Sequence, residues 1–440
     1  MIELERIVGA QHVQRDAIVG DRVLTGRAAA LVQPGSADEV AAVVAWCYAH
    51  DVAMVPLGGG TGLAGGAAPL SEDAVAIALD RLRSVRSFDP ALWRMEAEAG
   101  VTTATIARLA RENGLLFPPD PGAPEDSHLG GTIATNAGGP HAFKYGVTGD
   151  WVTGIEAVLA PGELVRFGGP LRKDVAGYDL GALLTGSEGT LGIVTAAWLR
   201  FVPAPEAQRA VVASYPDATA AAAAVARVLV SGVVPAALEY FDAQTMRIAG
   251  DTFPGGPLRG FVVLAEADGS AAEADRVSQE LVEALSEGTA RVWTSATRPL
   301  WRWRDGVSLA VAAARGAKLS EDIVVPVDRL AEAIDATVAI GKRHELEGCS
   351  WGHAGDGNVH ATFLLDPDDR GQRARAEAAA AEVFELALQL GGSVTGEHGI
   401  GIAKAGWLSR QWAPGALAAH RAAKSALDPR GLFNPGKKEP

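Results

Sequence analysis

The spacing of apolar residues predicts helices and short strands that alternate along the chain. Ser36 begins a capping box with Glu39, and apolar residues after it recur at the spacing of a helix face. Further elements expected in the first half are strands at 52–56, 74–79 and 94–99, the last at a sheet edge, a helix at 102–113, and a hairpin of 155–159 with 164–167. Residues 118–149 have almost no periodicity and predict a long functional loop.

The pattern of predicted helices and strands changes near residue 201. Elements expected there are a helix at 218–229, strands at 237–241 and 261–265, and helices at 271–285, 327–346 and 373–390. A helix-like stretch also follows Trp301–Arg304 and ends at Lys318, and Gly355-Asp-Gly-Asn358 is a strong turn signal. This alternation predicts an α+β fold, with a first domain at 1–205, a second at 206–400 and a closing segment at 401–440.

Length, charge and cysteine content limit the classes of function. The 440 residues suit two or three domains, and 48% hydrophobic residues allow a large core. A net charge of −14 and the absence of a Lys/Arg cluster argue against nucleic acid as a partner. Cys47 and Cys349 suggest no disulfide framework, and neither a signal peptide nor a membrane-spanning stretch is evident. We therefore expect a cytoplasmic protein without a transmembrane segment.

Three glycine-rich segments in the first half offer many backbone N–H groups with few side chains in the way. The first, Gly58–Gly66, follows a predicted strand, and six of its nine residues are glycine. The second covers Pro118–Gly122 and Gly130–Gly139, and the third covers Gly186–Gly192. Such segments bind phosphate groups through oriented N–H dipoles, so together they indicate a long dinucleotide. A flexible turn is the alternative for any one of them.

Two other nucleotide-binding motifs compete for the first glycine segment. No lysine follows it, as a Walker A loop would require. Gly60-Thr-Gly62-Leu-Ala-Gly65 matches a Rossmann fingerprint, with Asp80 about where a ribose ligand is expected. However, residues 67–73 are too short for the crossover helix of that fold, and Pro69 disfavours a helix. A non-Rossmann phosphate loop fits better, and an NAD-dependent Rossmann oxidoreductase stays open as an alternative.

The ordered motifs resemble the FAD-linked oxidases of the vanillyl-alcohol-oxidase/p-cresol-methylhydroxylase (PCMH) type, in the branch of D-lactate dehydrogenase, the glycolate oxidase large subunit and D-2-hydroxyglutarate dehydrogenase. The motifs that carry this resemblance are Pro56–Gly62, Pro118–Gly122, Thr135–Gly139, Lys173–Asp179, Gly186–Val194, Gly352–His360, Gly396–Gly399 and Asp428–Pro435. The resemblance implies a PCMH-type FAD-binding domain of two subdomains, an α+β cap domain with an antiparallel sheet, and a closing segment that returns to the FAD domain. It also implies an FAD-dependent dehydrogenase or oxidase that converts a small D-2-hydroxy acid to the 2-oxo acid. A non-catalytic FAD-binding subunit is a further alternative, because degenerate relatives exist.

The resemblance also implies which residues hold the cofactor. FAD is expected to bind non-covalently, because the first glycine segment has no histidine that could carry it. Lys173 and Tyr178 are expected to shape the FAD site. The residues expected to bind FAD are Pro56, Gly58, Gly59, Gly60, Thr61, Gly62, Leu63, Pro119, Asp120, Gly122, Gly130, Gly131, Thr135, Asn136, Gly138, Gly139, Tyr145, Gly146, Glu188, Gly189, Gly192, Ile193, Val194 and Asn434.

Histidines gather in two short motifs of the second half. His353 and His360 flank the predicted turn, and a hairpin there would bring their imidazoles together. Glu397 and His398 lie between two glycines, which allow an unusual backbone. Two histidines with a carboxylate are a common ligand set for a divalent metal, and a structural role is the alternative. The resemblance implies a metal at His353, His360 and Glu397, with zinc as the ion expected first.

Oxidation of a 2-hydroxy acid needs a carboxylate anchor, a base for the hydroxyl proton and a hydride acceptor. FAD would accept the hydride, and a metal would lower the pKa of the substrate hydroxyl. We expect His398 to be the base, because its near-neutral pKa suits reversible proton transfer. The branch implies that Arg304 and Lys318 hold the carboxylate and that Asn358 contacts flavin or substrate, while solvated surface charges are the alternative for the two cations. The electron acceptor (quinone, cytochrome, electron-transfer flavoprotein or oxygen) is left open, as is the choice between a homodimer and a subunit of a complex.

Overall fold

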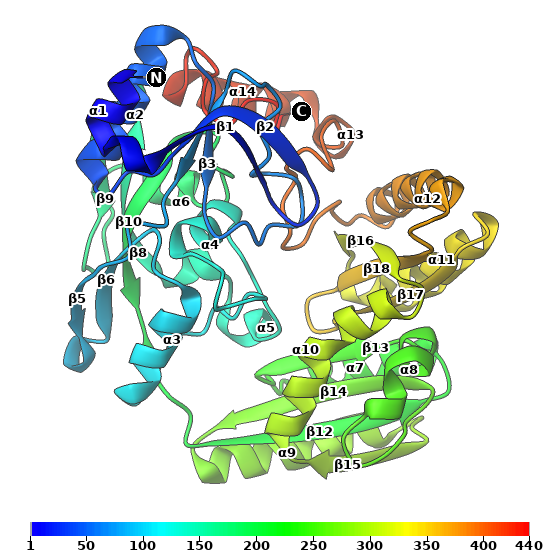
Figure 1. Cartoon of the computed structure of the whole chain (residues 1–440). Coiled ribbons are helices and arrows are strands. Elements are labelled where there is room, and N and C mark those ends of the chain that lie inside the picture. The colour runs from blue at the N-terminus through cyan, green and yellow to red at the C-terminus, as the bar shows by residue number, and fades with distance from the viewer. Residues whose placement is uncertain (1, 440) are drawn as a thin grey trace. The chain divides into compact units, whose positions relative to one another are not determined.

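The computed structural model describes residues 2–439 and separates into two compact units (Figure 1). Unit 1 contains the chain up to Gly139, the stretch Gly146–Ala204, and the chain from Glu397 onward. Unit 2 contains Pro205–Gly396 together with the short segment Pro140–Tyr145. Both units mix helices and sheets, so the predicted α+β class is confirmed. The sequence did not predict that residues 140–145 belong with the second half.

The first part of unit 1 is built on a four-stranded sheet. Its strands follow the order β1 (Val13–Gly20), β2 (Thr25–Val32), β4 (Val75–Ala78), β3 (Met54–Leu57). Two helices accompany this sheet, α1 (Ile2–Val8) and α2 (Ala37–His50). The Ser36 side chain accepts a hydrogen bond from the Glu39 amide, as the capping pattern predicts. The apolar faces of the helices and the sheet share one core with Phe433 of the closing segment.

The connection from β3 to β4 decides the question of the Rossmann fold. The two strands are parallel neighbours. A Rossmann unit would join such strands through a helix. The structure describes the connection, residues 58–74, throughout, and this stretch forms turns and bends without a helix. The NAD-dependent Rossmann alternative is therefore wrong.

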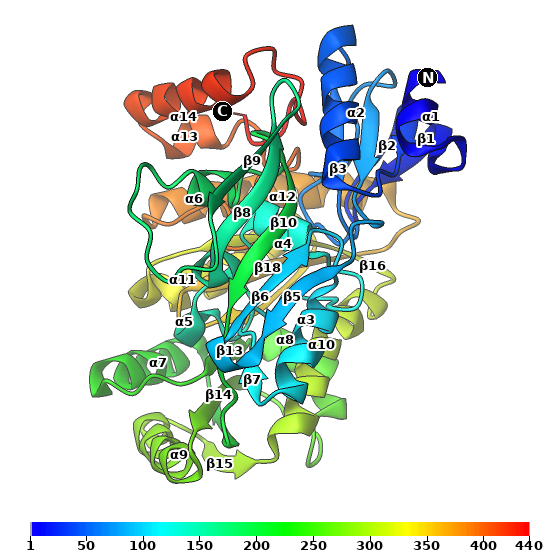
Figure 2. The same ribbon diagram turned by 90° about the vertical axis from the view of Figure 1, so that its left-hand side faces the viewer.

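A five-stranded antiparallel sheet forms the second part of unit 1 (Figure 2). Its order is β5 (Val85–Asp89), β6 (Arg94–Glu98), β10 (Ile193–Arg200), β8 (Val152–Leu159), β9 (Glu163–Gly168). The predicted hairpin is confirmed as β8 and β9. The predicted edge position of residues 94–99 is wrong, because β6 pairs on one side with the unpredicted strand β5 and on the other with β10.

Further helices and short strands complete unit 1. They are α3 (Thr103–Glu112), β7 (Leu115–Leu116), α4 (Leu129–Thr135), α6 (Leu180–Leu184), β11 (Val202–Pro203), α13 (Leu408–Gln411) and α14 (Pro414–Leu427). The stretch 118–149, predicted as a loop, contains α4 and a second short helix, α5 (Ala142–Tyr145). The sequence pattern missed them because both are short and α4 is rich in glycine and threonine, which give no amphipathic period. The closing segment returns to the first sheet, where Met54 exchanges backbone hydrogen bonds with Leu432 and Asn434.

Unit 2 is built on a seven-stranded sheet in which every neighbouring pair is antiparallel. Its order is β15 (Arg291–Ser295), β12 (Ala207–Tyr215), β14 (Phe261–Gly269), β13 (Ala237–Phe241), β17 (Glu347–His353), β18 (Asn358–Leu365), β16 (Ala317–Val324). The helices are α7 (Ala218–Ser231), α8 (Ala243–Ala249), α9 (Ala271–Ser286), α10 (Thr297–Ala313), α11 (Leu330–Arg343) and α12 (Arg370–Gln389). The predicted antiparallel cap sheet is confirmed.

Helices α8 and α10 cover one face of this sheet through a core that includes Phe241, Met246 and Trp303. Because α10 ends at Ala313 and β16 begins at Ala317, Lys318 lies on a strand, and the helix-like stretch predicted to reach Lys318 is too long. Among residues 2–439, no helix combines the length and apolar character needed to cross a membrane.

Candidate functional site

The residues predicted to bind substrate and the two histidines predicted to bind metal gather on one face of the seven-stranded sheet in unit 2. Side chains of residues paired directly across antiparallel strands point to the same face. His353 on β17 faces Glu239 on β13. His360 on β18 lies between Trp351 on β17 and Asp322 on β16. The register of the sheet therefore brings together residues that are more than a hundred positions apart in sequence.

The prediction that His353 and His360 lie close together is confirmed. The turn 354–357 joins β17 to β18, and the ring centroids of His353 and His360 lie 5.5 Å apart. Both side chains are buried. Glu397 is bonded to Gly396, the last residue of unit 2, and one ligand atom from each of His353, His360 and Glu397 lies within 4.8 Å of the others. Two imidazole nitrogens and a carboxylate oxygen fit zinc or a similar divalent ion.

Glu239 is a site residue that the sequence reasoning missed. Its carboxylate is fully buried and accepts hydrogen bonds from Arg304 Nε at 2.8 Å and from His353 Nδ1. Burial alone would raise the pKa of Glu239, but the Arg304 guanidinium and the hydrogen bond from His353 outweigh it and hold the pKa below its usual value. The signal in the sequence was a single charged residue inside the apolar strand Ala237–Phe241.

Asp322 is a second missed carboxylate on the same face. It is fully buried and accepts hydrogen bonds from Asn358 Nδ2 at 2.5 Å, Thr395 Oγ1 at 2.7 Å and the Gly396 amide at 2.9 Å. The other amide atom of Asn358, Oδ1, is buried without a hydrogen-bond partner among the described residues. Asp322 therefore fixes the side chain of Asn358 and the backbone that leads to Glu397.

The two predicted carboxylate anchors meet at α10. Arg304 and Ser308 lie one turn apart on this helix, and Lys318 Nζ donates a hydrogen bond to Ser308 Oγ at 2.6 Å. The Lys318 ammonium also lies over the Trp351 ring, 4.7 Å from its centroid. Burial lowers the pKa of Lys318 to about 8. Arg304 is not a solvated surface charge, since it is paired with Glu239, and Lys318 is partly buried.

In unit 1 the glycine segments approach one another closely. A Cβ on Gly59 would overlap the carbonyl oxygen of Asp126, so only glycine lets the first segment lie against the loop before α4. Gly139 likewise lies against Asp120, which joins the two parts of the second segment. Gly189 has a φ of +70° and lies against Pro56.

Backbone hydrogen bonds join the third glycine segment to the second at α4. The Gly186 amide donates to the Ile133 carbonyl at 2.8 Å, and the Glu188 amide donates to the Ala134 carbonyl at 2.7 Å. The three glycine segments therefore contact one another in unit 1, and oriented backbone N–H groups of this kind can bind a phosphate group. Apart from Tyr145, all the residues predicted to bind FAD belong to this unit.

The side chains of Glu188 and Asn434 form hydrogen bonds with backbone groups around these segments. The Glu188 carboxylate accepts hydrogen bonds from the amides of Ile400 at 2.9 Å and Gly401 at 2.7 Å. The side-chain amide of Asn434 donates through Nδ2 to the carbonyls of Gly66 at 2.9 Å and Glu188 at 2.8 Å. These contacts tie the first and third glycine segments to the closing segment of the chain.

Some predicted residues lie where the sequence did not place them. Tyr145 belongs to unit 2, and its hydroxyl donates a hydrogen bond to Asp268 at 2.5 Å. Tyr178 is 96% exposed, and Lys173 is exposed as well. His398 lies in unit 1, with Nε2 3.5 Å from a Glu397 carboxylate oxygen.

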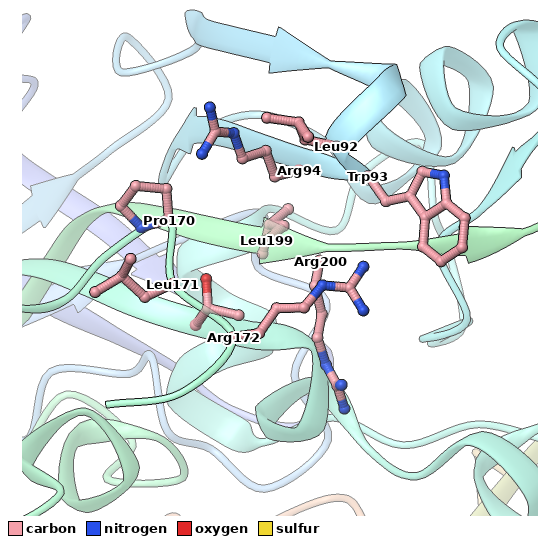
Figure 3. A pocket seen from close by; sticks show the side chains of 9 residues that line it. Leu92, Trp93, Arg94, Pro170, Leu171, Arg172, Leu199 and Arg200 are labelled. Carbon is pink, nitrogen blue, oxygen red and sulfur yellow. The ribbon is translucent and has the colours of Figure 1, made fainter. Parts of the chain in front are cut away.

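A separate shallow pocket in unit 1 contains none of the predicted site residues (Figure 3). Arg94, Arg172 and Arg200 line it, together with apolar residues from β10 and the loop after β9. The Arg172 guanidinium lies over the Trp93 ring, 5.2 Å from its centroid. With arginines alone as titratable groups, it offers no base for a hydroxyl proton.

Known proteins are similar to this chain in both sequence and fold. Residues 204–438 match the family of FAD linked oxidases, C-terminal domain, and residues 28–168 match the FAD binding domain. The chain is 37% identical to the glycolate oxidase subunit GlcD of Bacillus subtilis, over 93% of this chain and 88% of that protein. It is 32% identical to the D-lactate dehydrogenase of Anaerostipes hadrus, over 98% of this chain and 94% of that protein. The structure of p-cresol methylhydroxylase with substrate bound is similar at a TM-score of 0.79 and 16% identity, over 99% of this chain and 95% of that chain, which confirms the predicted PCMH-type fold.

Proposed function

Because this chain belongs to the FAD-linked oxidase family and is an FAD-dependent oxidoreductase, we propose that it oxidises a small D-2-hydroxy acid to the 2-oxo acid. Two relatives are named for glycolate and D-lactate, which are both small 2-hydroxy acids. In the reaction the substrate loses a proton from its hydroxyl group and a hydride from Cα. These two losses balance the conversion of the alcohol to a carbonyl group.

The glycine segments of unit 1 are the proposed FAD site. When bound, FAD supplies the acceptor for the hydride. Those backbone N–H groups of Gly58–Gly62, Gly130–Gly139 and Gly186–Gly192 that do not donate within the chain would hold its diphosphate. Non-covalent binding is part of the proposal, since the first segment has no histidine for attachment.

His353, His360 and Glu397 are the proposed ligands of a divalent metal, with zinc as the first candidate. Such an ion supplies positive charge that lowers the pKa of the substrate hydroxyl. The buried His353–His360 pair supports this role, because neutral imidazoles are good zinc ligands and this pair sits beside a carboxylate.

Arg304 and Lys318 are the proposed carboxylate anchors, and His398 is the proposed base. A guanidinium can bind a carboxylate through two parallel hydrogen bonds, and an ammonium adds a point charge. Asn358 Oδ1 is a buried acceptor that would orient the substrate or the flavin. His398 would take the hydroxyl proton on an imidazole nitrogen. The observation that carries the proposal is the gathering of two cations and two histidines on one buried sheet face.

The first experiment is a bleaching panel. Purified protein should be yellow, and its flavin absorption should fall when D-lactate, D-2-hydroxyglutarate or glycolate is added without oxygen. A yellow protein that none of these acids bleaches would instead support a non-catalytic FAD-binding subunit. Colourless protein that takes up no added FAD would refute the proposal as a whole.

The role of His398 is tested by His398→Ala. Loss of a general base typically lowers the rate by about 10²–10⁴-fold, so flavin reduction in a stopped-flow instrument should slow to that extent while FAD stays bound. The matched control is His50→Ala, which removes an exposed histidine hydrogen-bonded to the Trp46 carbonyl. An unchanged reduction rate in His398→Ala would refute the assignment.

A further inference from the structure

We propose that Glu239 is a positioning residue that orients His353 as a metal ligand and Arg304 as a substrate anchor at the same time. This inference rests on the proposed function. One carboxylate oxygen of Glu239 accepts from His353 Nδ1, and the other accepts from Arg304 at Nε and at a terminal nitrogen, both at 2.8 Å. A single side chain therefore links the two halves of the proposed substrate site.

The contact with His353 fixes the tautomer of the imidazole. Glu239 and His353 are directly paired across β13 and β17, so their side chains leave the sheet side by side. When Nδ1 carries the proton that it donates to a carboxylate, Nε2 carries the lone pair that a metal needs. A carboxylate behind a metal-binding histidine also raises the basicity of the ring and holds its plane.

The contact with Arg304 fixes the guanidinium before substrate arrives. Glu239 engages two neighbouring donors of Arg304, so the plane of the guanidinium is set by the sheet and not by the substrate. Pre-oriented groups lower the entropy cost of binding, which appears as a lower KM. Because Arg304 lies on α10 and His353 on β17, Glu239 sets their mutual geometry across two elements.

Packing alone does not explain a charged group at this position. The Glu239 side chain is fully buried, and burying a carboxylate is costly unless it is paired and hydrogen-bonded. Its neighbours along the strand, Leu238 and Tyr240, are buried apolar and aromatic residues. An apolar side chain would stabilise this part of the sheet as well, but it would leave both Arg304 and His353 without their carboxylate.

The test compares Glu239→Gln with Glu266→Gln in the FAD-loaded protein. Glu266 is the matched control because it is also fully buried on the same sheet face, yet it contacts His141, Gln208 and Trp301 and none of the proposed ligands. Zn²⁺ affinity is measured by competition with a chelator, and KM and kcat are measured with the acid that bleaches the wild type best. Removal of such a carboxylate typically costs about 10–100-fold in metal affinity.

The expected result is a Zn²⁺ dissociation constant raised about 10–100-fold in Glu239→Gln, with a higher KM, unchanged FAD content and no such change in Glu266→Gln. If Glu239→Gln does not fold, Glu239→Asp keeps the charge on a shorter side chain and should show a smaller loss in the same direction. Wild-type affinity for Zn²⁺ in folded Glu239→Gln would overturn the inference while the proposed function stands. Wild-type protein that neither binds Zn²⁺ nor bleaches with any acid would overturn the proposed function itself.

Discussion

At the residue scale, buried carboxylates on strands of the sheet mark the proposed site. Glu239 and Asp322 are fully buried, yet each makes several hydrogen bonds, and their partners include Arg304, His353 and Asn358 of the proposed site. Lys318 is the complementary case, because its ammonium is partly buried against Ser308 and Trp351 and keeps a lowered pKa. Burying polar groups of this kind is unfavourable in free energy unless they are paired, so their pairing is informative about function.

The lowered pKa of Lys318 predicts how substrate binding depends on pH. Burial lowers this pKa to about 8, so the side chain is a cation below that pH and becomes neutral above it. The substrate carboxylate is then held less strongly, and kcat/KM should fall as the pH rises through about 8. Arginine stays protonated throughout, so Lys318→Arg should lose this fall. The measurement is kcat/KM against pH.

The control for this profile is Lys342→Arg, which changes an exposed lysine at the end of α11. Its pH profile should match that of the wild type. If Lys318→Arg also keeps the wild-type fall near pH 8, another group is responsible for it.

At the element scale, the proposed FAD site is made largely of connections between helices and strands. The turns after β3, around α4 and before β10 carry the three glycine segments, and they lie close enough that side chains would separate them. Glycine is required at such positions because another backbone occupies the space of a Cβ.

Gly59→Ala tests this close approach. A methyl group there would overlap the Asp126 carbonyl, so the first glycine segment should move away from α4. We expect lower FAD content and an unfolding free energy lower by about 2 kcal/mol or more, measured by flavin absorption and chemical denaturation. In Gly169→Ala, the control, the added methyl group meets open space and should leave both quantities near the wild type. Wild-type FAD content in Gly59→Ala would contradict this prediction, because it would show that the first glycine segment accommodates the methyl group without losing FAD.

At the scale of the whole molecule, the end of the chain completes the first domain. Asn434 donates hydrogen bonds to the Gly66 and Glu188 carbonyls, and Lys437 Nζ donates to the Ala68 carbonyl at 2.6 Å. The glycine segments are thus held by residues that lie more than two hundred positions later in sequence. FAD binding should therefore depend on the closing segment even where that segment does not contact the cofactor.

Asn434→Ala removes the donor that bridges two glycine segments. It leaves two carbonyl groups without their hydrogen bonds in a largely buried place, which typically costs about 1–3 kcal/mol. Both the unfolding free energy and the affinity for FAD should fall, as measured by denaturation and by FAD titration of the apoprotein. Asn113→Ala is the control, because the Asn113 amide donates to the Leu109 carbonyl at an exposed helix end. Equal losses in the two variants would contradict the bridging role.

The sequence by itself determined the local features of this protein. Apolar periodicity located α2, α7, α9 and the β8–β9 hairpin, and the glycine motifs located the connections that approach one another. The turn at 355–358 was sufficient to predict that His353 and His360 meet. These predictions succeed because a helix period, a capping residue and a tight turn depend on residues near one another in the chain.

The tertiary structure decided which distant residues share a surface. Only the strand order shows that Glu239 lies behind His353, that Asp322 holds the backbone before Glu397, and that β6 is an interior strand. Only the fold shows that residues 140–145 leave the first half of the chain for unit 2. Strand order and register depend on contacts between segments that are far apart in sequence, and the local pattern of one strand carries no record of its partner.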